Sequence, residues 1–225
     1  MRTLFVTIIF GMACSPILAE SAAERMHEAT TVFNELMRTP DKGIPLDLLA
    51  RAHCVVIVPG LKKAAFIVGG QYGSGFAVCR APRRNAWGAP SAVRLEGGSF
   101  GFQIGAESTD VIMLVMSRHG IKQLLDDKFT LGGSASVAAG PVGRSTSANT
   151  DAFMSAGILS WSRSHGVFAG ISLNGSTLRN DVDENRELYG RSLHNRDILM
   201  KNVKPPAQAA RLLSSLTRLS PREEK

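Results

Sequence analysis

Three short apolar runs, separated by glycine-containing junctions, follow one another between residues 54 and 79. The runs cover residues 54–58, 64–68 and 73–79, and the pairs Pro59-Gly60 and Gly69-Gly70 stand between them. Runs of this length that are rich in β-branched residues are typical of buried strands, and glycine junctions favour tight connections. The pattern therefore predicts neighbouring antiparallel strands and argues against a helical bundle.

Helical patterns flank this β-rich region at both ends of the chain. Ser21 and Glu24 form a capping-box pattern ahead of an amphipathic segment that runs to about residue 38. A second amphipathic segment covers residues 207–219. We therefore expect an α+β fold in a single domain, with a mainly antiparallel β-sheet as a barrel-like core and flanking helices at both termini.

Further strands and turns are expected between these helices. The sequence predicts an edge strand at 93–95, strands at 100–106 and 111–116, and a hairpin formed by 158–163 and 167–173. It also predicts a helix that begins after Ser117 and a strand pair within 130–139. These elements add to the sheet rather than form a second domain.

Residues 1–19 resemble a secretory signal peptide. Arg2 precedes an apolar run at 4–13, and the small residue Ala19 provides a cleavage site. We expect a signal peptide at 1–19, a globular domain at 20–204, and a C-terminal helix and tail at 205–225. This organisation predicts a protein of the periplasm or cell envelope. Two alternatives are lipoprotein anchoring at Cys14 and a buried N-terminal helix.

Removal of residues 1–19 leaves two cysteines, Cys54 and Cys79. An exported protein with two cysteines can form one disulfide bond. Both residues also lie in apolar runs that predict strands, so a pair of buried free thiols is an equal alternative.

The chain is basic, with 26 Lys and Arg against 19 Asp and Glu, a net charge of +7. No acidic residue lies between Asp47 and Glu96, whereas that stretch holds seven cations. Such a balance favours polyanionic partners, among them phospholipid headgroups. Nucleic acid fits the charge but not the export signal, so we expect no nucleic-acid partner.

Within this stretch we expect the cations nearest to predicted turns to contact lipid phosphate groups. Trp87 follows them and is of a residue type that favours the membrane interface. In the alternative arrangement Trp87 packs on the sheet and the arginines are merely solvated. The candidate lipid-binding residues are Lys62, Lys63, Arg80, Arg83, Arg84 and Trp87.

Residues 97–101 match the G-x-S-x-G pattern of a serine nucleophile, with Ser99 at its centre. That motif requires a helix after the serine, whereas a strand-like run follows here. We therefore interpret the glycines as a strand feature and predict no catalytic residue and no enzymatic activity.

The segment 181–185 resembles the start of a calcium loop. Arg186 occupies the position that requires glycine, and Ser192 occupies the position that requires glutamate. The histidines form no metal-binding motif either. We expect no metal and no cofactor.

Taken together, several short motifs resemble the SYLF domain family. They run in order over residues 22–205, and we quote the segments Pro40-Asp41-Lys42-Gly43-Ile44-Pro45, Ala52-His53-Cys54-Val55-Val56-Ile57-Val58-Pro59, Gly69-Gly70-Gln71-Tyr72-Gly73-Ser74-Gly75, Trp87-Gly88-Ala89-Pro90, Gly101-Phe102-Gln103-Ile104-Gly105-Ala106, Gly140-Pro141-Val142-Gly143-Arg144, Gly166-Val167-Phe168-Ala169-Gly170 and Tyr189-Gly190. The resemblance implies a membrane-binding module without catalytic residues. Eukaryotic members bind phosphoinositides through basic residues and an amphipathic N-terminal helix, and some bind actin. Exported bacterial members are similar to stand-alone lipid-binding proteins.

The leading hypothesis is an exported protein that associates with anionic phospholipid, with phosphoinositide-like headgroups, through a basic surface. The alternative is an envelope structural or protein-interaction module without lipid specificity, whose partner the sequence does not name. A hydrolase that uses Ser99 is a third hypothesis, supported only by that serine.

Overall fold

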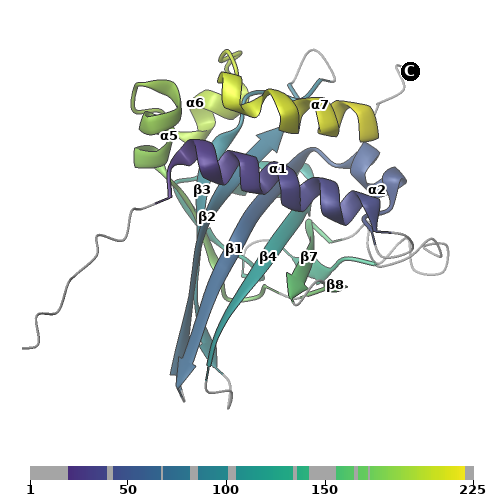
Figure 1. Cartoon of the computed structure of the whole chain (residues 1–225), viewed down its shortest axis with the longest axis vertical. Coiled ribbons are helices and arrows are strands. Elements are labelled where there is room, and N and C mark those ends of the chain that lie inside the picture. The colour runs from purple at the N-terminus through teal and green to yellow at the C-terminus, as the bar shows by residue number, and fades with distance from the viewer. Residues whose placement is uncertain are drawn as a thin grey trace, which may run out of the picture.

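The structure is a computed structural model that describes residues 20–39, 43–66, 68–81, 86–100, 105–133, 136–141, 156–164, 167–171 and 173–220. Its centre is a nine-stranded sheet with helices packed against it (Figure 1). All strand pairs are antiparallel except β6 with β7. The expectation of an α+β domain with a curled, mainly antiparallel sheet and helices at both termini is confirmed.

Four long strands form the middle of the sheet. They are β1 (Cys54–Phe66), β2 (Val68–Cys79), β3 (Ser91–Phe100) and β4 (Gly105–Val115). Strand β1 pairs with both β2 and β4, and β2 also pairs with β3. Strands β1 and β2 extend well beyond the helices, toward the bottom of Figure 1.

Short strands complete the sheet on both sides. Strands β9 (Thr177–Asn180) and β5 (Lys128–Thr130) follow β3. Strand β7 (Ile158–Ser164) follows β4, and its outer edge is shared by β6 (Val137–Ala139) and β8 (Val167–Gly170). The expected hairpin of β7 and β8 is confirmed.

Three details of the expected strand pattern were wrong. Residues 54–58 and 64–66 belong to one strand, because Gly60 with φ of 56° lies in a register shift between β1 and its neighbours and not in a turn. Residues 93–95 lie inside β3, between β2 and β9, and not at an edge. The two strands near 130–139 do not pair, because β5 joins β9 and β6 joins β7.

Helices α1 (Ala22–Arg38), α2 (Leu46–Arg51) and α7 (Ala210–Leu219) cover one face of the sheet, and α1 lies beside α7. The expected capping box at Ser21 and Glu24 is present. Alternate β1 residues such as Val55 and Ile57 join the apolar core beneath these helices. A 3-10 helix, Ala207–Ala209, leads into α7.

The other β1 residues, Val56 and Val58 among them, face a second apolar core. That core includes residues of α3 (Arg118–Leu124) and α6 (Asn195–Met200), as well as β5 and β9. Helix α5 (Val182–Tyr189) packs against β3 and α1. Because residues 54–58 of β1 are buried on both faces, this part of the strand is continuously apolar rather than alternating.

The described helices include none whose length and apolar character would suit a membrane span.

Candidate functional site

Arg80 and Trp87, two of the predicted lipid-binding residues, lie in the interior. Arg80 is 9% exposed and Trp87 is 7% exposed. The Arg80 guanidinium donates to the carbonyl oxygens of Ala52 and Ser220 at 3.1 and 2.9 Å. The Trp87 Nε1–H donates to the Ser220 hydroxyl at 3.0 Å. Both residues therefore connect the β2 end to the end of α7, which differs from the expected surface position.

Lys62 and Lys63 lie at the opposite end of the β1–β2 hairpin. Lys62 pairs with Tyr72, whereas Cys54 pairs with Cys79 beside Arg80. At about 3.3 Å per strand residue, the lysines are roughly 25 Å from Arg80. Arg83 and Arg84 lie outside the described residues. The structure thus does not bring the described members of the predicted cluster together.

Lys62 is exposed and Lys63 is half-buried at this far end. Neither forms an ion pair among the described residues. Glu107 lies directly opposite Lys63 in the register of β1 and β4, so an acidic residue accompanies the two lysines.

Cys54 and Cys79 form a disulfide bond. The two residues face each other in the register of β1 and β2, with Cα atoms 4.0 Å apart. Of the two alternatives for these cysteines, the structure therefore has the bonded pair. The bond closes the helix-side end of the hairpin, next to Arg80.

A hollow of about 470 Å³ lies between α1 and α7, and we call it the helical groove. Its α1 side carries His27, Thr31 and Asn34, and its α7 side carries Arg211 and Arg218. The other residues around it are Thr30, Ala210, Ser214 and Ser215. No described carboxylate lines the helical groove.

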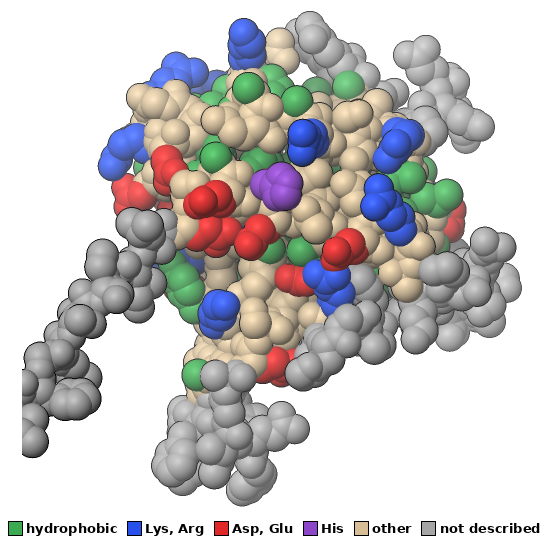
Figure 2. All heavy atoms as spheres, in the orientation of Figure 1, with side chains coloured by type: hydrophobic (Ala, Val, Ile, Leu, Met, Phe, Trp, Pro, Cys, Tyr) green, Lys and Arg blue, Asp and Glu red, His purple; other side chains and the backbone are tan. Residues whose placement is uncertain are grey.

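Two of the three carboxylates on α1 have partners elsewhere. Glu24 accepts the Ser21 backbone N–H at 2.9 Å, which lowers the pKa of Glu24. Glu35 pairs with Arg163 on β7. Figure 2 shows Lys and Arg side chains over the upper part of this face, where α7 lies, and a band of Asp and Glu below α1. Since Arg211 and Arg218 form no ion pair among the described residues, they are available to an external anion.

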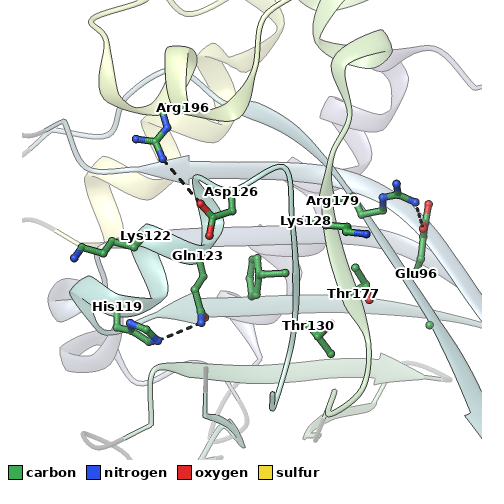
Figure 3. A pocket seen from close by; sticks show the side chains of 12 residues that line it. Glu96, His119, Lys122, Gln123, Asp126, Lys128, Thr130, Thr177, Arg179 and Arg196 are labelled. Carbon is green, nitrogen blue, oxygen red and sulfur yellow. Dashed lines mark hydrogen bonds and ion pairs between the residues drawn. The ribbon is translucent and has the colours of Figure 1, made fainter. Parts of the chain in front are cut away.

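A larger hollow of about 1040 Å³ lies at the β5 side of the sheet, and we call it the strand groove (Figure 3). Helix α3 contributes Lys122 and Gln123, and β5 and β9 contribute Lys128 and Arg179. Arg196 from α6 completes the cationic rim.

Two of these cations are held by carboxylates. Arg179 pairs with Glu96 at 3.1 Å and Arg196 with Asp126 at 4.0 Å. Lys122 and Lys128 form no ion pair among the described residues. The strand groove therefore combines two available cations with two carboxylates on its rim.

The motifs that the sequence analysis rejected have structural roles. Ser99 lies within strand β3, opposite Gly69 of β2, and not at a strand-to-helix turn. Asp181 caps α5 by accepting the backbone N–H of Glu184 at 3.2 Å. Among the described residues, no three His, Cys, Asp or Glu side chains are grouped as metal ligands.

The sequence did not reveal either groove. Both unite residues of elements that are far apart in the chain, such as His27 with Arg211 and Lys122 with Arg196. The helical periodicity that places Arg211 and Arg218 on one side of α7 was the only local signal.

The fold and these surfaces define an α+β domain with cationic grooves. Residues 96–219, more than half of the chain, match the family described as "Ysc84: Las17-binding protein actin regulator". The chain belongs to the Ysc84 family, which is the SYLF family. The resemblance to the SYLF family that its motifs indicated is therefore confirmed.

Similar proteins cover most of the chain. The rat "SH3 domain-containing YSC84-like protein 1" is 34% identical over 207 residues, which are 92% of this chain and 60% of the relative. The human protein of that name is 35% identical over 199 residues, 88% of this chain and 57% of the relative. "LAS seventeen-binding protein 3" of Saccharomyces cerevisiae is 37% identical over 169 residues, 74% of this chain and 36% of the relative.

The chain thus spans about 60% of the length of the mammalian relatives. The family description and the name of the yeast relative refer to binding and regulation, and none of the printed names refers to a catalysed reaction.

Proposed function

We propose that this protein associates with anionic phospholipid through the face formed by α1 and α7. The observation that carries the proposal is the helical groove, where Arg211 and Arg218 meet His27 and no described carboxylate. Arginine offers a planar set of N–H donors that matches phosphate geometry. The hydroxyl and amide groups of Thr31 and Asn34 supply further hydrogen bonds to phosphate oxygens.

The charge of the groove supports a surface association rather than tight binding. Each cation near an anionic bilayer contributes about 1 kcal/mol, and this attraction falls off within a Debye length. The two unpaired arginines therefore give a modest affinity that decreases with salt. The polar character of this exposed side favours headgroup contact over insertion.

This proposal revises which residues contact lipid. Arg80 and Trp87 use their donor groups inside the protein, and Lys62 and Lys63 lie at the far end of the hairpin. Since a flat bilayer cannot contact both ends of the molecule together, the lysine pair is assigned no part in this contact. Arg83 and Arg84 follow Arg80 in sequence and remain candidates.

The same proposal places the protein in the periplasm or cell envelope. The signal-peptide pattern of residues 1–19 and the disulfide of Cys54 with Cys79 support an oxidising compartment. N-terminal sequencing and intact-mass measurement of the protein from its own envelope test cleavage after Ala19 and lipidation of Cys14.

Vesicle sedimentation tests the lipid contact. Wild type is compared with Arg211→Glu/Arg218→Glu on vesicles of phosphatidylcholine alone, with phosphatidylglycerol, and with a phosphoinositide. We expect wild type to bind only the anionic vesicles, and the variant to lose at least roughly thirtyfold in affinity, since two attractions of about 1 kcal/mol each are removed and two repulsions are added.

The matched control is Lys62→Glu/Lys63→Glu, which changes the net charge equally at the other end. It should bind like wild type. Equal losses of affinity in both double variants would show that net charge alone governs binding. Retained binding by Arg211→Glu/Arg218→Glu would exclude the helical groove as the contact. Salt-insensitive binding to a protein partner without lipid would favour the interaction module, which the names of the relatives also suggest.

A further inference from the structure

The strand groove is a second hollow with a different chemistry. Its volume of about 1040 Å³ is at the upper end of the roughly 300–1,000 Å³ typical of ligand sites. It is lined by residues of α3, α6, β3, β5 and β9, and it shares no lining residue with the helical groove. A ligand in the strand groove would therefore contact other residues than those proposed for the lipid contact.

The rim offers charge at several separated places. The amines of Lys122 and Lys128 have no ion-pair partner among the described residues. Figure 3 shows these two lysines on different sides of the hollow, with Arg196 beside Asp126 and Arg179 beside Lys128. This spacing suits a ligand that carries more than one negative group along its length.

The groove also contains groups that accept hydrogen bonds from hydroxyls. The carboxylates of Glu96 and Asp126 lie beside the cations. Thr130 and Thr177 add hydroxyl groups. Closely spaced anions, such as those of nucleic acid or an acidic peptide, would be repelled by these carboxylates, whereas hydroxyls between the anions would donate to them.

Gln123 adds a polar group in the wall of the hollow. Its side chain is 6% exposed, and its Nε2 lies 3.2 Å from Nε2 of His119. The Oε1 atom has no hydrogen-bond partner among the described residues. Because this atom is buried, Gln123 shapes the wall of the hollow rather than its open surface.

The lining does not suit an acyl chain. Phe129 is the one large apolar side chain among the described lining residues, and it is 7% exposed. Lipid tails need an extended apolar channel, whereas hydroxylated ligands need the mixture of cations, carboxylates and hydroxyls found here.

We propose that the strand groove binds an acidic oligosaccharide, with its acid groups on Lys122 and Lys128 and its hydroxyls on Glu96 and Asp126. The site is independent of the lipid contact at the helical groove. The protein would then hold a phospholipid surface and an acidic glycan at two separate sites.

Calorimetric titration with hexagalacturonate and with a heparin hexasaccharide tests this site, and fully methyl-esterified hexagalacturonate serves as the uncharged probe. We expect at least one acidic probe to bind and the ester to bind at least tenfold more weakly. Lys122→Glu/Lys128→Glu should lose the binding by a similar factor, whereas Arg211→Glu/Arg218→Glu should retain it. Amide NMR shifts should move around Gln123 and Phe129.

Three results would overturn the proposal. They are the absence of binding by both acidic probes, equal binding of the ester, and equal losses in the two double variants. If Lys122→Glu/Lys128→Glu instead loses binding to phosphatidylglycerol vesicles, the strand groove is a lipid site. The proposed lipid contact is tested independently, by the binding of Arg211→Glu/Arg218→Glu to anionic vesicles.

Discussion

The guanidinium carbon of Arg80 lies 4.3 Å from the ring centroid of Trp87, and both side chains donate to Ser220. Arg80 directly follows β2, Trp87 lies in the segment before β3, and Ser220 is the C-cap residue of α7. This arrangement joins the C-terminal helix to the sheet. Arg80 and Trp87, which the sequence suggested as membrane contacts, therefore stabilise the fold.

We predict that Arg80→Met destabilises the protein by about 2–3 kcal/mol, because buried carbonyl groups lose charge-assisted donors. Urea denaturation measures the change. Trp87→Phe keeps the ring but removes the Nε1–H, and should lose about 1 kcal/mol. Folded Arg80→Met protein should bind anionic vesicles like wild type, and reduced binding without loss of stability would restore the lipid role of Arg80.

The disulfide closes a hairpin with a sequence separation of 25 between Cys54 and Cys79. Loss of a cross-link of this loop length lowers stability by about 3 kcal/mol. We therefore expect Cys54→Ala/Cys79→Ala to unfold at a lower urea concentration than oxidised wild type. Wild type treated with reductant should unfold at the same urea concentration as the double variant. Reductant should not affect the double variant. An identical midpoint for oxidised and reduced wild type would show that the thiols are unpaired.

Gly75 lies where β1 and β2 leave no room for a side chain. A Cβ atom at this position would lie 2.0 Å from the Ile57 carbonyl oxygen, which is part of the backbone. We expect Gly75→Ala to destabilise the protein by about 2 kcal/mol or more, since the strand must shift. Gly98→Ala is the control, because a Cβ there has no atom within 4 Å, and its unfolding free energy should stay the same or rise slightly.

Burial raises the pKa of the Glu184 carboxyl to about 6, against the opposing effect of its partner Arg25. Asp181 and Glu187 nearby raise it further. The ordinary pKa of this carboxyl, which applies to the unfolded chain, is 4.5, so the folded state holds the proton more tightly. The protonated carboxyl therefore stabilises the fold fully below pH 4.5, and this stabilisation is lost as pH rises through 6.

The shift corresponds to a loss on the order of 2 kcal/mol between pH 4 and pH 7. Glu184→Gln cannot titrate, so the stability of wild type relative to this variant should fall by that amount over the interval. Urea denaturation at intermediate pH values measures the difference. A constant difference would contradict the raised pKa and would indicate that Arg25 fully compensates for burial.

The sequence predicted the elements whose signals are local. The capping box at Ser21 and the short helix after Ser117 are formed by residues within a few positions of one another. Such patterns act through backbone hydrogen bonds in one turn of chain. They do not depend on the rest of the fold, which is why they could be recognised.

The interpretation of glycines was less successful, because one residue type serves several geometries. Gly60 adopts a positive φ within β1, where its N–H donates to Asp110 at 2.9 Å. Gly69 and Gly70 pair with β1 and β3 inside β2. A bulge and a turn have the same local sequence signal, and only the partner strand distinguishes them.

The sequence by itself determined the fold class, the flanking helices, the basic charge and the family, because these follow from local periodicity, composition and order of motifs. Only the tertiary structure decided which cations lie together. It buried Arg80, placed Lys62 at the far end of the hairpin, and united Lys122 with Arg196 around one hollow. Charges attract or repel through space, so their distance along the chain carries little information about their common action.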